Sequence, residues 1–308
     1  MNIAVIGPGA MGLLFGGYLS RKHQVTLVGT RPEVMRGIEE SGVTIREADG
    51  TQAVYHPRAT ADPAALSPAD LVILFVKSGA SRAALEAGRS LIGKDTLLLT
   101  LQNGAGHEAV LRHFTDDEHI IIGTTQQGSY RLSASSICHS GGGSTSLGAV
   151  CGSSERFAPV AQAFEECGFP CSLTDHVRGM IWNKLMINAS SSVLSGILQM
   201  PQGYVIQNEG AWDVACRLIR ELCAVATADG YPFDAAEQIQ RIHRHLENAP
   251  DGYTSIYADL KAGRTTEAAV INGAVVDAAR RLGVPAPTHE IILALVQALE
   301  QRPASSDS

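Results

Sequence analysis

Residues 3–12 read Ile-Ala-Val-Ile-Gly-Pro-Gly-Ala-Met-Gly, and this stretch decides the fold of the N-terminal half. Its last six residues fit the pattern G-x-G-x-x-G, which is a weak signal alone. Here the pattern follows a predicted buried strand and opens a predicted helix, the context in which it binds a dinucleotide. Gly7 would allow the tight turn, Gly9 the approach of a pyrophosphate, and Gly12 the packing of helix on strand. The alternative is a plain glycine turn. The predicted cofactor residues of this turn are Gly7, Pro8, Gly9, Ala10, Met11 and Gly12.

The residues after the second predicted strand favour NADP over NAD. An NAD enzyme usually has Asp or Glu there to bond the ribose 2′-OH. This chain reads Val28-Gly29-Thr30-Arg31-Pro32, with no carboxylate before Glu33. Arg31 would pair with the 2′-phosphate of NADP, and Thr30 would add a hydroxyl donor. The alternative is that Arg31 is a solvated loop residue.

The rest of the N-terminal half alternates apolar runs with helical patterns. This alternation predicts an α/β domain with a parallel, doubly wound sheet of Rossmann type. The predicted strands, which lack strict alternation and so are expected to be buried on both faces, are Ile3–Ile6, Val25–Val28, Leu71–Val76, Leu97–Leu101 and Ile120–Gly123. The predicted helices are Ala10–Arg21, Pro32–Ser41, Ser81–Leu91 and Glu108–Phe114. The Ser- and Gly-rich segment Gly128–Ala149 is expected to form the antiparallel end of the same sheet.

Strand signals stop near residue 174, and long helical patterns follow. The chain is therefore predicted to hold a Rossmann-type cofactor domain over residues 1–174 and an all-helical substrate domain over residues 175–308. Gly230 and Gly283, each with a proline two residues later, are expected to end helices. The polar tail Ala304–Ser308 is expected to fray. The predicted helices are Met180–Leu198, Glu209–Asp229, Thr265–Leu282 and Thr288–Gln301.

Composition limits the function classes. With 308 residues and a net charge of −7, the chain lacks the basic field that a duplex-binding surface needs, so nucleic acid is not an expected partner. No apolar run reaches the roughly 18 residues of a membrane span, and the N-terminus lacks a signal-peptide pattern, so a cytoplasmic protein is expected. Six cysteines fit packed, reduced thiols. A Cys167/Cys171 metal pair is the weaker alternative, and no metal is expected.

Several polar residues are candidates for chemistry. Lys77 and the run Gln102-Asn103-Gly104 follow predicted strands, where open α/β sheets bind ligands; a snorkelling lysine and a plain turn are the alternatives. Lys184, Asn188 and Ser192 lie at i, i+4 and i+8, so they should form one polar line on an apolar helix. That lysine could instead snorkel to solvent.

Glu267 has two interpretations from the residues alone. It is predicted in the first turn of the helix that starts at Thr265. An acidic residue there favours the helix dipole and can complete a cap, and this structural interpretation is the stronger of the two. The other interpretation is a functional carboxylate.

The ordered set of motifs resembles the ketopantoate reductase family. The resemblance covers almost the whole chain, in the family's order. Its pieces are the glycine turn, Val76-Lys77, Gln102-Asn103-Gly104, Trp182-Asn183-Lys184-Leu185 with Asn188, Ser255 with Asp259, Gly263-Arg264-Thr265-Thr266-Glu267 and Ile271-Asn272-Gly273.

The resemblance implies roles for individual residues. Lys184 would be the general acid and Glu267 its carboxylate partner, also near the cofactor. Residues implied to contact the cofactor are Arg31, Lys77, Asn103 and Ser129. Residues implied to contact the substrate are Asn103, Lys184, Asn188, Ser192, Gln202 and Ser255. Ser192, Gln202 and Gly252 stand where family members often carry asparagine, so the substrate contacts are partly altered.

The resemblance also implies the reaction. It is the NADPH-dependent reduction of 2-dehydropantoate (ketopantoate) to pantoate, a step of pantothenate biosynthesis, with the small 2-keto acid bound between the two domains. The alternatives are reduction of another small 2-keto acid, or a non-catalytic NADP(H)-binding sensor, which would not need a proton donor. Whether two copies of the chain form a homodimer is left open by the sequence.

Overall fold

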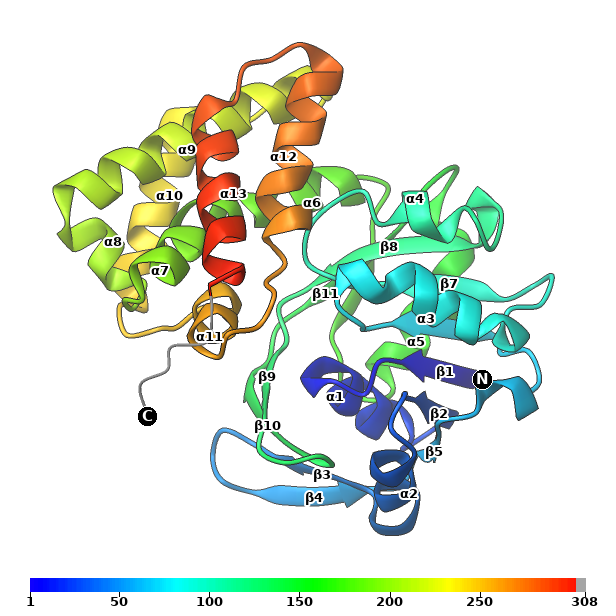
Figure 1. Ribbon diagram of the computed structural model, residues 1–308. Coiled ribbons are helices and arrows are strands. Elements are labelled where there is room, and N and C mark those ends of the chain that lie inside the picture. Colours follow the sequence, from blue (N-terminus) through cyan, green and yellow to red (C-terminus); the bar gives the residue numbers. More distant parts are fainter. Residues whose placement is uncertain (303–308) are drawn as a thin grey trace. The chain divides into compact units, whose positions relative to one another are not determined.

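The computed structural model describes residues 1–302, so the tail predicted to fray, Ala304–Ser308, lies outside the described residues. The chain divides into two compact units (Figure 1). Unit 1 comprises Met1–Gln102 and His107–Val177. Unit 2 comprises Asn103–Gly106 and the chain from Arg178 onward.

Unit 1 is built on an eight-stranded sheet in the order β12-β11-β8-β7-β6-β1-β2-β5. All five predicted strands form within it, because their side chains are buried on both faces of the sheet. The neighbours from β8 to β5 are parallel, and β11 runs antiparallel to β8. The strands are β1 (Asn2–Ile6), β2 (Gln24–Val28), β5 (Arg58–Thr60), β6 (Leu71–Leu74), β7 (Leu97–Thr100), β8 (Ile120–Thr125), β11 (Thr145–Ala149) and β12 (Cys171–Leu173).

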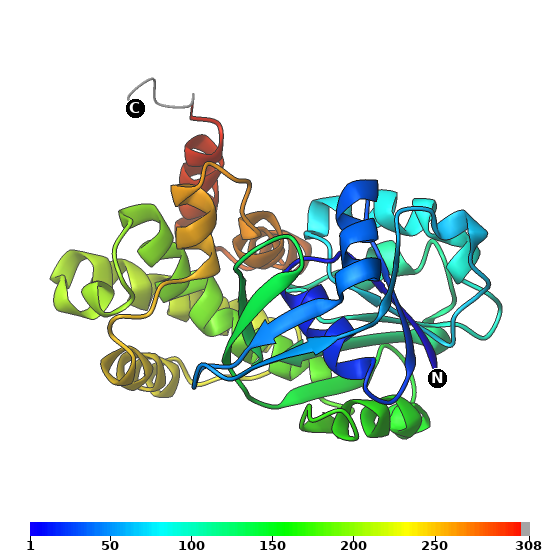
Figure 2. The same cartoon turned by 90° about the horizontal axis from the view of Figure 1, so that it is seen from below.

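Helices cover both faces of this sheet, as the predicted doubly wound fold requires. Phe15 of α1 contacts Phe164 of α5 at 5.5 Å between ring centroids, so these two helices share one face. Figure 2 shows α3 and α4 on the other side of the sheet from α5. The helices of unit 1 are α1 (Ala10–Leu19), α2 (Pro32–Ser41), α3 (Ser81–Ala87), α4 (Glu108–Leu111) and α5 (Ala158–Glu165).

A second, four-stranded sheet corrects the expectation for Gly128–Ala149. Only β11 joins the main sheet; β9 (Gly128–Arg131) and β10 (Ser136–Gly141) pair instead with β3 (Val43–Arg46) and β4 (Gln52–Tyr55). The order is β4-β3-β10-β9, and β10 runs parallel to β3, although about 90 residues separate them in the chain. A local pattern does not reveal such a distant partner.

Unit 2 is all helical, as predicted. Its core consists of apolar side chains from several helices, and the 20-residue α9 packs against α8, α10, α12 and α13. The helices are α6 (Val177–Ile187), α7 (Val193–Leu198), α8 (Gly203–Gln207), α9 (Glu209–Ala228), α10 (Ala235–Asn248), α11 (Ser255–Lys261), α12 (Ala268–Leu282) and α13 (Pro287–Glu300). The sequence patterns did not predict α8, α10 or α11.

The predicted single helix Met180–Leu198 is interrupted. Between α6 and α7, residues Asn188–Ser192 form a π-helical segment. The hydroxyls of Ser190 and Ser191 donate to the carbonyls of Met186 and Ile187, four residues earlier, and so compete with the helical pattern. π-Helical segments occur often at functional sites, so the interruption supports Asn188 and Ser192 as candidate site residues.

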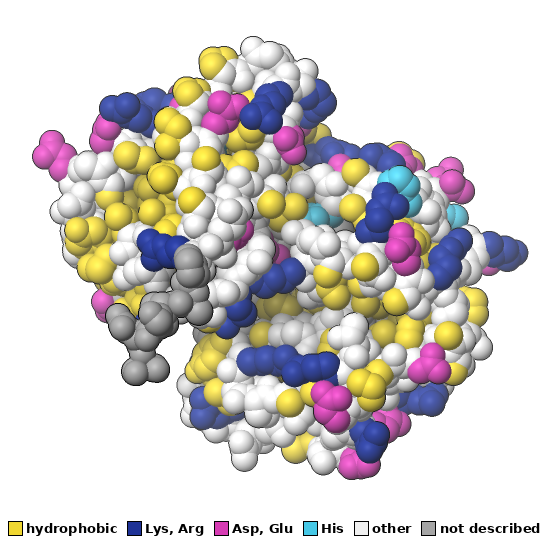
Figure 3. Space-filling model, viewed as in Figure 1, with side chains coloured by type: hydrophobic (Ala, Val, Ile, Leu, Met, Phe, Trp, Pro, Cys, Tyr) yellow, Lys and Arg dark blue, Asp and Glu magenta, His cyan; other side chains and the backbone are white. Residues whose placement is uncertain are grey.

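All six cysteines are free thiols. Four are buried, as expected for packed thiols: Cys138, Cys167, Cys216 and Cys223. Within residues 1–302, no group of three His, Cys, Asp or Glu side chains could hold a metal ion, and no helix is long and apolar enough to cross a membrane. Figure 3 shows positive and negative side chains interspersed on the face in view.

Candidate active site

The glycine turn between β1 and α1 has the geometry of a phosphate cradle. Gly7 has φ +99°, and a Cβ there would lie 2.6 Å from the backbone nitrogen of Val76. A Cβ on Gly12 would lie 2.0 Å from the carbonyl oxygen of Gly7, so only glycine lets the helix pack this closely. Gly9, in contrast, faces open space, because a Cβ there would meet nothing within 4 Å. The first-turn amides of α1 have no acceptor inside the helix, so an anion fits in front of Gly9.

The other predicted cofactor residues of unit 1 lie around this turn. Thr30 and Arg31 are exposed at the end of β2, and Gly29 beside them packs against the ring of Pro8. Ser129 of β9 donates its hydroxyl to the sulfur of Met11 at 3.2 Å. β6 ends at Leu74 rather than at Val76 as predicted, so the exposed Lys77 stands three residues beyond the strand, before a short 3₁₀ turn.

Lys184 lies on α6 and is only partly exposed, although its neighbours Leu185 and Met186 are fully in the core. Burial lowers the pKa of Lys184 to about 8, and the negative charge of Glu267 opposes this shift. A lysine that snorkelled into water would keep a pKa near 10.4. The position of Lys184, mostly out of water and near Glu267, therefore favours a functional lysine over a snorkelling one.

The Glu267 side chain makes no cap bond to its helix, so the capping part of the structural interpretation is wrong. α12 begins at Ala268 rather than at Thr265, and Glu267 stands just before it without a side-chain cap bond. The hydroxyl of Thr266 instead accepts from the amide of Ala268 at 3.0 Å. The Glu267 carboxylate accepts from Nδ2 of Asn103 at 3.0 Å. Asn103, Glu267 and Lys184 thus form one polar cluster in unit 2.

The segment Asn103–Gly106 is held on α12 by its backbone. The amide of Ala105 donates to the carbonyl of Val270 at 3.1 Å. Gly104 has φ +102°, and a Cβ there would lie 2.2 Å from the same carbonyl oxygen. This close approach, which only glycine allows, fixes Asn103 beside Glu267.

The predicted substrate residues outside this cluster line one cavity of about 230 Å³ in unit 2. Asn188 and Ser192 come from the π-helical segment, Gln202 precedes α8, and Ser255 begins α11. The residues that complete the wall are Ile187, His245, Thr254, Ile256 and Ile271. His245 was not foreseen, because the sequence analysis did not predict α10, which carries it, although Asp234 and Glu237 form a helix-start pattern there.

Hydrogen bonds behind and within the cavity wall hold the π-helical segment in place. Nδ2 of Asn272, a fully buried residue, donates to the carbonyl of Ala189 inside the π-helical segment at 2.9 Å. The hydroxyl of Thr254 donates to the carbonyl of Ser192 at 3.2 Å. Oε1 of Gln202 is buried without a protein partner, so it can accept a hydrogen bond from a ligand.

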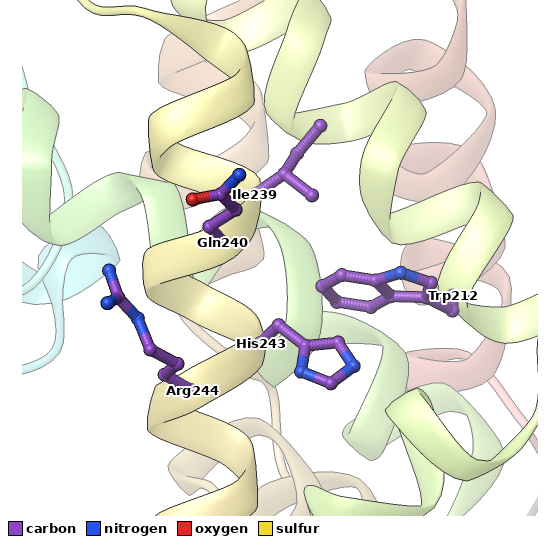
Figure 4. A pocket seen from close by; sticks show the side chains of 5 residues that line it. All are labelled: Trp212, Ile239, Gln240, His243 and Arg244. Atoms are coloured by element: carbon purple, nitrogen blue, oxygen red, sulfur yellow. The ribbon is translucent and has the colours of Figure 1, made fainter.

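Two further hollows contain none of the predicted site residues. One, of about 300 Å³, lies between α9 and α10, where Trp212 meets His243 edge-on (Figure 4). The other, of about 550 Å³, lies at the amino ends of the main sheet's strands in unit 1. In open α/β sheets ligands bind at the opposite, carboxyl edge, where the glycine turn lies.

Known proteins resemble this chain along nearly its full length. Residues 3–152 match the family described as ketopantoate reductase PanE/ApbA, and residues 176–300 match the C-terminal part of that family. The 2-dehydropantoate 2-reductase of Halobacterium salinarum is 32% identical over 305 residues, which cover 98% of this chain and 99% of that protein. The enzyme of the same name from Pyrococcus horikoshii is 29% identical and covers 97% of this chain and 98% of its own.

Solved structures agree on the fold. D-mandelate dehydrogenase, in a ternary structure with NADH and anilino(oxo)acetate, has a TM-score of 0.91 at 28% identity, over 97% of this chain and 98% of that one. A PanE/ApbA family ketopantoate reductase from Ralstonia eutropha JMP134 has a TM-score of 0.86 at 31% identity, over 97% and 98%.

The docking of Asn103–Gly106 can be tested with two alanine substitutions. Gly104 and Gly106 both have positive φ, so Gly104→Ala and Gly106→Ala should share a backbone strain of about 1–2 kcal/mol. Gly106 faces open space, whereas Gly104 meets Val270. We therefore expect Gly104→Ala to lower the free energy of unfolding by roughly 1–3 kcal/mol more than Gly106→Ala in denaturant titrations. Equal losses would show that the close approach contributes nothing.

Proposed function

Because this chain belongs to the ketopantoate reductase PanE/ApbA family, we propose that it reduces 2-dehydropantoate to pantoate with NADPH, a step of pantothenate biosynthesis. The observation that carries the proposal is the cluster of Lys184, Glu267 and Asn103, in the same unit as a polar cavity of substrate size. Its lysine has a pKa lowered to about 8, close to the value that suits a proton donor near neutral pH.

Residues 1–174 are proposed as the cofactor domain. The pyrophosphate of NADPH fits the amides in front of Gly9, and Arg31 with Thr30 would receive the 2′-phosphate, since no carboxylate stands at the end of β2. When bound, NADPH supplies the hydride that adds to the ketone carbon. Lys77, Ser129 and Asn103 would complete its contacts.

Residues 175–308 are proposed as the substrate domain, with Lys184 as the general acid. As the hydride adds to the ketone carbon, negative charge develops on the ketone oxygen. The Lys184 ammonium stabilises this charge and gives its proton to that oxygen, which becomes the product hydroxyl; the neutral amine then takes a proton from solvent. Glu267 keeps the ammonium charged and in place, and Asn103 holds the Glu267 carboxylate.

The cavity residues would bind the rest of the keto acid. Ser255 opens α11, so its hydroxyl and the free amides of the first turn suit a carboxylate. Asn188, Ser192 and Gln202 would contact the remaining polar groups, and Gln202 offers a buried acceptor to a substrate hydroxyl.

A second candidate substrate is a 2-keto acid with a bulkier apolar group. The likeness to D-mandelate dehydrogenase, solved with anilino(oxo)acetate, favours it. The cavity itself adds support, because Ile187, Ile256 and Ile271 line it and Ser192 is a small side chain. The same acid, Lys184, would serve either substrate.

Steady-state rates on a panel of keto acids distinguish these candidates. We expect the highest kcat/KM with 2-dehydropantoate and NADPH, and a clear loss with NADH. A higher kcat/KM with phenylglyoxylate would move the assignment to the second candidate. Tight NADPH binding without turnover of any keto acid would contradict both and favour a sensor.

The pH dependence of the rate tests Lys184 as the acid. Reduction needs the ammonium form, so kcat should be highest below pH 8 and fall as the pH rises through the pKa of Lys184. Oxidation of the hydroxy acid needs the neutral amine, so its kcat should rise with pH over the same range. Lys184→Ala should lower kcat by roughly 10²–10⁴ and abolish this dependence of kcat on pH. A variant with a near-normal kcat would place the proton donor elsewhere.

A further inference from the structure

Arg131, which the sequence motifs did not include, lies beside the glycine turn. It stands two residues after Ser129 on β9, and alternate residues of a strand point to the same side. Ser129 contacts Met11 in the first turn of α1, and Nη2 of Arg131 donates to the carbonyl of Pro8 at 2.5 Å. β9 therefore lies along the turn that is proposed to hold the cofactor.

Arg131 also lies close to Arg31. Pro8, which Arg131 contacts, packs against Gly29, two residues before Arg31. Burial lowers the pKa of Arg131, and the positive charge of the nearby Arg31 lowers it further. Both nevertheless stay charged at neutral pH, because a guanidinium does not lose its proton in proteins.

The arrangement leaves donors for an anion. Arg131 makes two hydrogen bonds to the protein, and Nη2 donates both, to the carbonyls of Pro8 and Ala134. Its Nε and Nη1 therefore remain to donate to a ligand. Within residues 1–302, neither Arg31 nor Arg131 pairs with a carboxylate. Two like charges held together in this way are stabilised by a bound anion, and a phosphate matches the planar fork of each guanidinium.

We propose that Arg131 and Arg31 together bind the 2′-phosphate of NADPH, so that Arg131 is a second determinant of cofactor specificity. The inference rests on the proposed preference for NADPH. It adds a residue from the second sheet to a site that the end of β2 alone was expected to form. A mere support for the loop, through the carbonyls of Pro8 and Ala134, would instead make Arg131 equally important for NADH.

Binding of the two cofactors to the full-length protein tests this directly, because NADPH and NADH differ only in the 2′-phosphate. Dissociation constants would be measured by fluorescence titration for wild type, Arg131→Gln and Arg131→Lys. Arg131→Gln keeps a donor for the Pro8 carbonyl and removes the charge. We expect its Kd for NADPH to rise about 10- to 100-fold, the effect of losing charge-assisted hydrogen bonds, with the Kd for NADH nearly unchanged. Arg131→Lys keeps the charge but lacks the planar fork of donors. Its Kd for NADPH should therefore lie between those of wild type and Arg131→Gln.

Arg156→Gln is the matched control. Arg156 is an exposed arginine of unit 1 at the amino edge of the sheet, beside the start of β7, and its loss changes the net charge equally. Arg156→Gln should leave the Kd for NADPH and the Kd for NADH unchanged. If Arg131→Gln weakens NADH and NADPH equally, or changes neither, Arg131 does not read the phosphate and the inference is wrong. If wild type binds both cofactors equally, the proposed NADPH preference itself fails, which is a separate result.

Discussion

Unit 2 has to keep the ammonium of Lys184 charged in a largely apolar helix. Burial disfavours a charged amine, and an opposite charge nearby is the usual compensation. Glu267 supplies that charge, and it is available because Thr266 provides the cap of α12 in its place. Asn103 in turn holds the Glu267 carboxylate, and the close approach of Gly104 to Val270 fixes Asn103. The result is a lysine that is still mostly protonated at neutral pH but releases its proton more readily than a lysine in water.

The π-helical segment is the second constraint, because it shapes the cavity. An α-helix through Asn188–Ser192 would continue the polar line expected from the i, i+4, i+8 spacing. The wider turn instead leaves carbonyls for other donors, and Asn272 donates to one of them, that of Ala189. This bond is fully buried, so losing it would leave an unpaired polar group in the core. Asn272, which does not itself line the cavity, therefore helps to hold the cavity wall in place.

The five central strands of the main sheet could be predicted from the sequence for a physical reason, whereas its edge strands β5 and β12 were not predicted. Strands buried on both faces are nearly continuous apolar runs, such as Leu71–Leu74, and these are visible without knowledge of their partners. The second sheet was missed because β3 and β4 are short and partly exposed, and β3 pairs with β10 far along the chain. Arg131 was not predicted either, because the resemblance implied only Ser129, two residues earlier on β9, and no local pattern places this strand along the glycine turn. In unit 2, the roles of Lys184 and Glu267 came from resemblance, because spacing alone favoured a helix cap for Glu267.

The proposed chemistry depends on a balance in which burial lowers the pKa of Lys184 and Glu267 keeps that pKa from falling further. NMR titration of the lysine side chains, with the Lys184 signal assigned by its absence in Lys184→Ala, measures this without any substrate or turnover. We expect a pKa of about 8 in wild type and a still lower value in Glu267→Gln, because that substitution removes the charge that favours the ammonium. A pKa near 10.4 in wild type, the value of a lysine in water, would contradict it.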